Sequence, residues 1–142
     1  MSQDNVEIVR RAYDAWNRGD PETAFEFLDP DVEVSVPPDL PEAGTYRGRA
    51  EVKHWVAEQL LPILEEIRAE PEKFFDAGDQ VVVLVRYFGR GKASGIEVRG
   101  AIVDAHVWTL RDGKVQKLQM YQGTEKALEA VGLSDQDAHA DP

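Results

Sequence analysis

The chain has 142 residues, the usual size of one domain, and a chain of this length buries enough surface for a hydrophobic core. Its 16 basic and 27 acidic residues leave a net charge of −11, which repels phosphate backbones and anionic membranes and excludes nucleic acid and membrane partners. It contains no cysteine, so disulfides, thiol nucleophiles and thiolate metal sites are excluded as well.

The location and the domain limits follow from hydropathy. No stretch approaches the roughly 20 apolar residues that cross a bilayer, and the N-terminal segment has neither the basic nor the apolar part of a signal peptide. We therefore expect a cytoplasmic protein. We also expect one domain over residues 1–133 and a disordered tail over 134–142, because the polar tail has nothing to bury.

Two helices are expected at the N-terminus. Apolar residues recur at helical spacing between Asp4 and Arg18, and Gly19 suits the end of that helix. Asp20 then precedes Pro21, in the order of a capping residue and the first residue of a helix. The sequence therefore predicts a helix over 4–18 and a short second helix after it.

A strand and a long helix follow. Residues 32–36 alternate valine with polar residues, as in a half-buried strand, and a loop is expected from there to Gly48. An apolar stripe from Val52 to Ile67 keeps helical spacing over about four turns. Pro62 should kink or split this third helix.

The rest of the chain reads as strands and one short helix. The expected strands cover 74–75, 80–88, 96–110 and 114–122. Short turns at 77–79 and 112–113 and a glycine-rich loop at 89–95 join them, so we expect antiparallel hairpins. Thr124 can cap a last helix that stops at Gly132. The predicted fold class is α+β.

Several local strings resemble the SnoaL-like branch of the NTF2-like superfamily, which has the ketosteroid isomerase-like fold. They run from about residue 5 to residue 133 and are AYDAWNRGD, PDVEVSVPP, GTYRGRAEVKHWV, FFDAGDQVVVLV, VWTLRDGKVQKL and EKALEAVGL. The resemblance implies a cystatin-like cone, in which a curved antiparallel sheet wraps around a long helix, with two short N-terminal helices. It also implies a hydrophobic pocket inside the cone.

The family's activities do not follow from its fold, because each known reaction needs particular side chains. The likeness to ketosteroid isomerase puts Ala12, Val36 and Ala105 where its catalytic tyrosine, base and second aspartate stand. Epoxide hydrolase and polyketide cyclase relatives need an acid on the last strand, but 114–122 contains none. Dehydratase relatives need two histidines, and only His106 lies on a predicted pocket strand. No recognised catalytic set is present.

The strand over 96–110 has two candidate faces. Alternation puts Ala105 on one face and Asp104 and His106 on the other, and the resemblance turns the alanine face toward the pocket. The outer face would then carry a set of side chains suited to a homodimer contact: His106, Trp108, Gln119 and Tyr121. If the strand is bulged instead, Asp104 and His106 enter the pocket together and become candidate bases.

Arg86 is the third candidate catalytic residue. It stands in an apolar strand, where a buried guanidinium needs a negative partner. One interpretation pairs it with a surface acid such as Glu97 across the hairpin. The other makes it the anchor for a carboxylate or enolate oxygen of a ligand.

Six further residues are candidates for a ligand-binding wall that accepts a small apolar or ring-shaped molecule. They are Tyr13, Trp16, Tyr46, Trp55, Met120 and Gln122. Plain core packing is the alternative for each aromatic residue on a helix. The loop at 89–95 opens no helix, which favours a turn over a phosphate site. His54 and His139 have no ligand spacing with His106, so no metal is predicted, and no other cofactor is implied.

The sequence thus predicts a small-molecule pocket protein of the SnoaL-like family. Its expected activity is cofactor-independent proton transfer on an apolar metabolite, as an isomerase, cyclase or lyase that dehydrates its substrate. The alternative is a non-catalytic ligand-binding or dimerisation module. A titratable group that faces the pocket favours an enzyme, and an apolar lining favours a binder.

Overall fold

The computed structural model describes residues 2–36, 44–62, 64–122, 125–130 and 132. The helices are α1 (Ser2–Asn17), α2 (Pro21–Glu26), α3 (Arg49–Trp55), the π-helical turn η1 (Val56–Leu60) and α4 (Glu125–Ala130). The strands are β1 (Leu28–Val36), β2 (Gly44–Arg47), β3 (Leu64–Ala77), β4 (Gln80–Gly91), β5 (Glu97–Arg111) and β6 (Lys114–Gln122). Among these residues no helix is long and apolar enough to cross a membrane.

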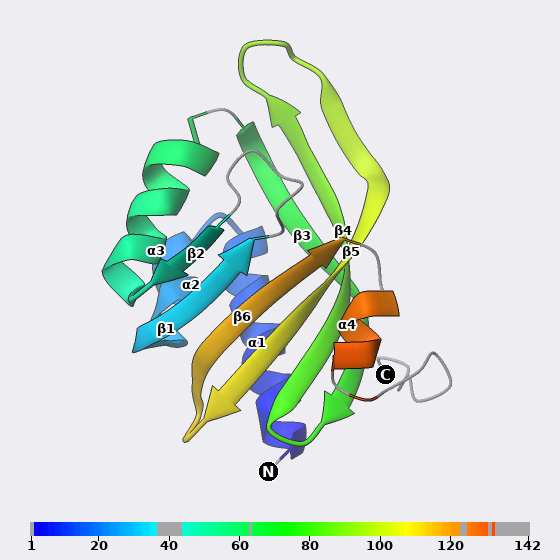
Figure 1. Ribbon diagram of the computed structural model, residues 1–142. Coiled ribbons are helices and arrows are strands. Elements are labelled where there is room, and N and C mark those ends of the chain that lie inside the picture. The colour runs from blue at the N-terminus through cyan, green and yellow to red at the C-terminus, as the bar shows by residue number, and fades with distance from the viewer. Residues whose placement is uncertain (1, 37–43, 63, 123–124, 131, 133–142) are drawn as a thin grey trace.

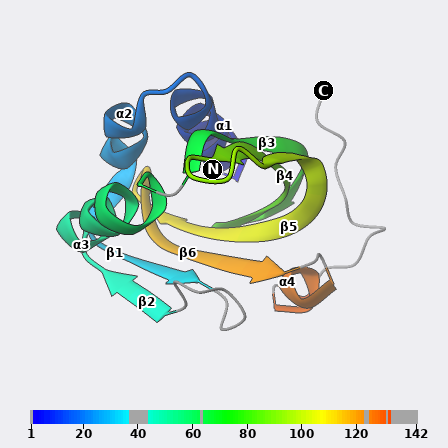
Figure 2. The ribbon, with the colours of Figure 1, turned by 90° about the horizontal axis from the view of Figure 1, so that it is seen from above.

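The strands form one curved sheet in the order β2-β1-β6-β5-β4-β3, which confirms the expected α+β fold with a curved sheet (Figure 1). Seen from above, the sheet curls around α1, while α4 lies against its other side (Figure 2). We call the side toward α1 the inner face and the opposite side the outer face. Two hydrophobic clusters correspond to these faces, one with α1 and one with α4.

The N-terminal helices form largely as expected from local signals. Asp20 caps α2, because its Oδ1 accepts a hydrogen bond from the Thr23 backbone N–H at 3.2 Å, and Pro21 takes the first helical position. Gly19 ends the preceding turn with a φ of 81°. However, α1 is not short: its 16 residues make it the helix that the sheet encloses.

The prediction of a long third helix is wrong. α3 has 7 residues, the π-helical turn adds 5, and the chain then passes through Pro62 into β3. Proline lacks a backbone N–H and clashes with the preceding turn, so the helix stops although the apolar stripe continues. Ile67 therefore lies in a strand. β3 is also far longer than the predicted 74–75, because β4 pairs with it from Leu64 to Ala77.

Two further expectations about the sheet are corrected. The segment before Gly48 holds the short strand β2, in which Tyr46 pairs with Val34 of β1. The sheet is not wholly antiparallel, because β1 runs parallel to β6, with Val34 opposite Leu118. Two strands at opposite ends of a chain cannot be joined by a hairpin, so no local turn signal announces this pairing.

The hairpin turns are confirmed. Asp112 and Gly113 have φ values of 52° and 77°, the positive pair that a tight two-residue hairpin needs. The glycine-rich loop is closed by a hydrogen bond from the Gly91 N–H to the Ile96 carbonyl at 2.9 Å, and it joins β4 to β5 as a turn. Thr124 and the tail over 134–142 lie outside the described residues.

Asn17 fixes the end of α1 to the sheet. Its Nδ2 donates to the Ala69 carbonyl at 2.9 Å, and its Oδ1 accepts from the Ala69 N–H at 2.8 Å. The side chain thus pairs with the backbone of β3 much as a neighbouring strand would. Because α1 carries Tyr13, this clamp also holds Tyr13 over the inner face.

Candidate functional site

His106 and Trp108 lie on the inner face, which corrects the expectation that they belong to an outer dimer contact. In the ladder between β4 and β5, His106 pairs with Val83 and Trp108 with Val81, and both valines belong to the inner cluster. His106 is only 4% exposed. The face with Ala105 is the outer one, so the alternative in which His106 enters the interior is the correct one.

The size of the side chains explains this choice of face. Ala105 and Val107 lie under α4, where they pack in one cluster with Ala127 and Leu128. Small residues let a helix approach a sheet closely. The large rings of Tyr13 and Trp108 instead pack together between α1 and the sheet, with centroids 5.3 Å apart. The register itself is unbroken here, so no bulge is needed to turn His106 inward.

A chain of hydrogen bonds crosses the inner face through His106. The Tyr13 hydroxyl lies 2.7 Å from His106 Nδ1, and the Tyr87 hydroxyl lies 2.6 Å from His106 Nε2. The Trp108 indole N–H donates to the Tyr13 oxygen at 2.9 Å. Residues from α1, β4 and β5 therefore meet in one polar network inside an apolar cluster. We call it the inner network.

The protons of the inner network can be ordered. Burial lowers the pKa of His106 to about 4, so its imidazole is neutral at pH 7 and carries one N–H. Trp108 can only donate, so the Tyr13 oxygen accepts from it, and we assign the Tyr13 O–H as the donor to Nδ1. Nε2 then carries the proton and donates to Tyr87. This tautomer is assigned from the network, and it leaves the Tyr87 proton to be donated onward.

Tyr87 forms the end of this chain of donors. Burial raises its pKa well above the usual value, and the negative charge of nearby Asp104 raises it further. Burial likewise raises the pKa of Tyr13. Both phenols are therefore neutral donors at pH 7. Tyr87 is partly exposed, whereas Tyr13 and His106 are buried, so Tyr87 is the most exposed of these three residues.

The other predicted wall residues lie on the same face. Met120 pairs with His106 across the ladder between β5 and β6, and Trp16 packs against the inner cluster from α1. Tyr46 and Trp55 stack with ring centroids 5.0 Å apart and planes at 22°. The structure thus brings these four side chains to the inner face. The side chain of Gln122 lies outside the described residues.

Arg86 does not take part, which corrects its assignment as a catalytic candidate. It alternates with Val85 and Tyr87, so it belongs to the outer face, where its guanidinium forms an ion pair with Glu72 of β3. The two side chains are 41% and 39% exposed, so neither charge is strongly desolvated. The simpler interpretation was right in kind, although the expected partner was Glu97.

Sequence reasoning missed Tyr87. The signal was available in the strand, because Tyr87 continues the inward series of Val81, Val83 and Val85. Arg86 stands between Val85 and Tyr87 in the sequence but points to the other face. A charged residue in an apolar run attracts attention first. The phase of the alternation would have pointed to its neighbour instead.

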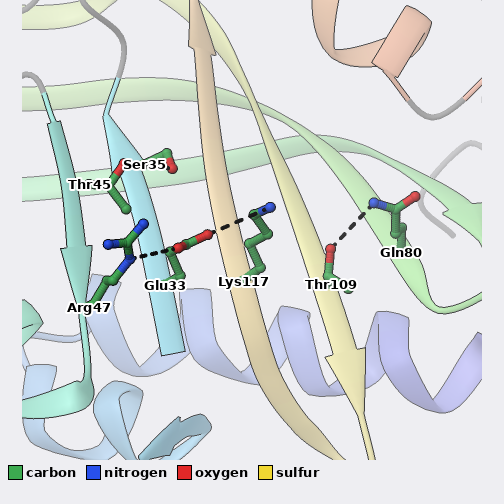
Figure 3. A network of polar contacts seen from close by, with 7 residues as sticks. All are labelled: Glu33, Ser35, Thr45, Arg47, Gln80, Thr109 and Lys117. Carbon is green, nitrogen blue, oxygen red and sulfur yellow. Dashed lines mark hydrogen bonds and ion pairs between the residues drawn. The ribbon is translucent and has the colours of Figure 1, made fainter. Parts of the chain in front are cut away.

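The outer face carries a different kind of polar group (Figure 3). Arg47 Nε lies 3.0 Å from Glu33 Oε1, and Lys117 Nζ lies 3.6 Å from Glu33 Oε2. On the next two strands of the sheet, β5 and β4, Gln80 Nε2 donates to Thr109 Oγ1 at 3.3 Å. We call the three charged residues the outer ladder. All are partly exposed to solvent.

Comparison with known proteins agrees with this architecture. The family described as the SnoaL-like domain matches residues 9–118. The chain belongs to the SnoaL-like family. No curated protein matches this SnoaL-like chain.

Solved structures extend the likeness over nearly the whole SnoaL-like domain. An NTF2-like protein of unknown function from Burkholderia pseudomallei is 25% identical, with 92% of this chain and 98% of that chain covered and a TM-score of 0.76. TerC, co-crystallized with polyporic acid, is 26% identical, with 91% and 98% covered and a TM-score of 0.73. An NTF2-like protein from Burkholderia thailandensis is 28% identical, with 87% and 94% covered and a TM-score of 0.71.

Proposed function

We propose that this SnoaL-like protein is a cytoplasmic enzyme that moves a proton on a small, ring-shaped carbonyl compound bound at its inner face. The observation that carries the proposal is the inner network, which ends on the hydroxyl of Tyr87, a partly exposed residue with Asp104 nearby. A neutral donor next to a carboxylate is an acid–base pair. The likeness to TerC, whose structure contains polyporic acid, supports a ring compound as the ligand.

Each group has one role in the proposed reaction. The Tyr87 hydroxyl donates a hydrogen bond to the carbonyl oxygen, and the Asp104 carboxylate takes a proton from the adjacent carbon. The electrons of that C–H bond form the C=C bond of an enolate, whose oxygen Tyr87 stabilises. Return of the proton from Asp104 to another carbon gives isomerisation. Its transfer to a departing β-hydroxyl releases water and gives dehydration. Attack of the enolate carbon on a second carbonyl, whose oxygen then takes the proton, gives cyclisation.

His106 is a positioning residue in this scheme and does not act as the base. Both of its ring nitrogens are bonded to tyrosine hydroxyls. By donating from Nε2 to the Tyr87 oxygen, it makes the Tyr87 proton a better donor, because hydrogen bonds in a chain polarise one another. Tyr13 and Trp108 hold the imidazole in the required tautomer.

The alternative function is a non-catalytic ligand-binding module. It is favoured by the closure of the inner network, since each ring nitrogen of His106 already has a tyrosine partner. It is also favoured by the lack of every catalytic set recognised in the family. In this case the network only stiffens the wall of a binding site.

Deuterium exchange separates the two functions. The protein is incubated in D₂O with 4-cyclohexylcyclohexanone, and the loss of the protons next to the carbonyl is followed by ¹H NMR. The enzyme accelerates the loss, and Tyr87→Phe and Asp104→Asn each reduce the acceleration by about 10- to 100-fold. Arg86→Met, on the outer face, leaves it unchanged. Binding without acceleration supports the binding module, and no binding of the ketone overturns the proposal.

We also propose a homodimer that forms through the outer face. His106 and Trp108 no longer support it, and Tyr121 packs in the cluster under α4. Gln119, which pairs with Val107, remains on the same face as the outer ladder. The outer ladder adds charges of both signs, which can pair with a second copy across a two-fold axis. Sizing at micromolar concentration checks the dimer, and a monomer of 15.9 kDa at all concentrations refutes it.

A further inference from the structure

Trp55 is held firmly beside β2, the edge strand that is separated from β4, the strand of Tyr87, by β1, β6 and β5 in the sheet order. It is the last residue of α3 and is 8% exposed. Its ring stacks on Tyr46, which pairs with Val34 in the ladder between β2 and β1. The indole therefore has a fixed position beside β2, whereas Tyr87 stands on β4.

The indole N–H of Trp55 is buried and donates a hydrogen bond to no acceptor in the part of the chain that the structure describes. Buried polar groups are nearly always hydrogen-bonded, and exceptions in native proteins call for a specific explanation. Trp108 shows the ordinary case, since its N–H donates to Tyr13. An indole can only donate, so the group that satisfies Trp55 must be an acceptor.

The backbone next to Trp55 is also unusual. The π-helical turn begins directly after it, and the Leu61 N–H bonds to the Val56 carbonyl at 2.9 Å, five residues back. Such turns are rare and occur frequently at functional sites. This turn alone assigns no ligand, but it is what distinguishes the end of α3 from an ordinary helix end.

We infer that the Trp55 N–H is a second ligand anchor, which donates a hydrogen bond to an oxygen of the molecule bound at the inner face. This inference rests on the proposed function. It adds the class of substrate: an apolar ring system that carries acceptor oxygens at two ends. One oxygen meets Tyr87, where the proton transfer occurs, and the other meets Trp55, which only binds.

Two ketones of matched length test the inference. The first is bicyclohexyl-4,4′-dione, with a carbonyl at each end, and the second is 4-cyclohexylcyclohexanone, with one carbonyl. The full chain is labelled with ¹⁵N, and its three tryptophans give three indole N–H signals that are assigned by single Trp→Phe substitutions. We expect the dione to move the Trp55 signal downfield in a saturable way. The monoketone should not do so.

Affinity gives a second measurement. The dione should bind about tenfold more tightly than the monoketone, and Trp55→Phe should remove that difference. Because the NMR shift is measured on the unchanged chain, the test remains valid if Trp55→Phe fails to fold.

The outcomes distinguish the two proposals. If both ketones bind with equal affinity, undergo exchange that depends on Tyr87, and leave the Trp55 signal in place, the second anchor is wrong and the proposed function stands. If neither ketone binds, the proposed function is wrong and the anchor falls with it. A downfield Trp55 signal with the dione alone supports the anchor.

Discussion

The two faces of the same sheet use polar side chains in opposite ways. On the inner face, Tyr13, His106 and Tyr87 are neutral, enclosed by apolar residues and joined by short hydrogen bonds. On the outer face, Glu33 and its basic neighbours are charged and in contact with water. Successive residues of one strand therefore lie in two different environments, an apolar interior and a solvated surface.

The difference between the two faces indicates which polar contacts contribute most to stability and function. A hydrogen bond in a poorly solvated interior is strong, and its loss leaves unpaired groups that water cannot reach. An ion pair at the surface replaces contacts with water that are nearly as good. Neutral groups on the inner face should thus outweigh full charges on the outer face.

The largest effect is expected at His106. The substitution His106→Leu leaves the hydroxyls of Tyr13 and Tyr87 without their partner in a buried site. Each unsatisfied buried group costs about 1–3 kcal/mol, so we expect the free energy of unfolding to fall by about 3 kcal/mol. Urea denaturation measures it. The matched control is His54→Leu on the exposed side of α3, which should change the free energy by less than about 0.5 kcal/mol.

Rescue separates a polar role from a packing role at His106. Glutamine can both donate and accept, so His106→Gln should recover part of the stability that His106→Leu loses. Equal loss in both variants would mean that the shape of the imidazole matters and its hydrogen bonds do not. The comparison between the two faces would then lose its main support.

The next largest effect is on the pH dependence of stability. Burial lowers the pKa of His106 to about 4, from an ordinary value of 6.5. Between these values the unfolded chain binds more protons than the folded one, so stability is complete above pH 6.5 and falls as the pH drops toward 4. The shift corresponds to about 3 kcal/mol in total.

The measurement is a difference between two proteins. Unfolding of the wild-type chain and of His106→Gln is followed from pH 7 to pH 4.5, and carboxylates common to both cancel. The wild type should lose about 2 kcal/mol more than the variant over this range. Parallel curves would show that His106 titrates normally and is not enclosed.

Local signals in the sequence predicted local structure well. Asp20 with Pro21, and Asp112 with Gly113, each contain the chemistry of their cap or turn, and the structure confirms both. Pro62 was recognised as a helix breaker, but the apolar stripe beyond it was read as more helix. An apolar stripe indicates which residues are buried but not whether they lie in a helix or a strand. A strand with register shifts, such as β3, can bury the same residues.

The site was predicted less completely for a physical reason. Alternation separates Ala105 from His106 but does not say which of the two faces the interior, because that depends on what covers each side. Here α4 covers the alanine side. Tyr13, Trp55 and Met120 were expected on the pocket side and do lie on the inner face, whereas Tyr87 was passed over although its alternation with Val85 was visible in the sequence. What the sequence could not state is that the hydroxyls of Tyr13 and Tyr87 meet at His106. Contacts between distant segments are what a single sequence states least directly.

The assignment of the faces can be tested at Ala105. The substitution Ala105→Leu adds carbon atoms between the sheet and α4, and overpacking of this kind costs about 1–3 kcal/mol. Hydrogen exchange should show weaker protection in α4, while ketone binding at the inner face persists. The resemblance to ketosteroid isomerase instead placed Ala105 in the pocket. If that placement were right, Ala105→Leu would block ketone binding and leave the protection of α4 against hydrogen exchange unchanged.

The smallest effect is expected at the outer ladder, and it completes the comparison. Glu33→Gln removes a carboxylate that contacts both Arg47 and Lys117. Arg47 is 76% exposed, so water replaces the lost contact, and the free energy of unfolding of the monomer should change by no more than about 0.5 kcal/mol. The matched inner substitution is Tyr13→Phe, which also removes one oxygen with two partners but should cost several times more. Denaturation in urea at low protein concentration measures both variants. If Glu33→Gln costs as much as Tyr13→Phe, the outer face is covered and not in contact with water. The proposed homodimer would cover it in this way. The ratio of the two costs should then change with protein concentration.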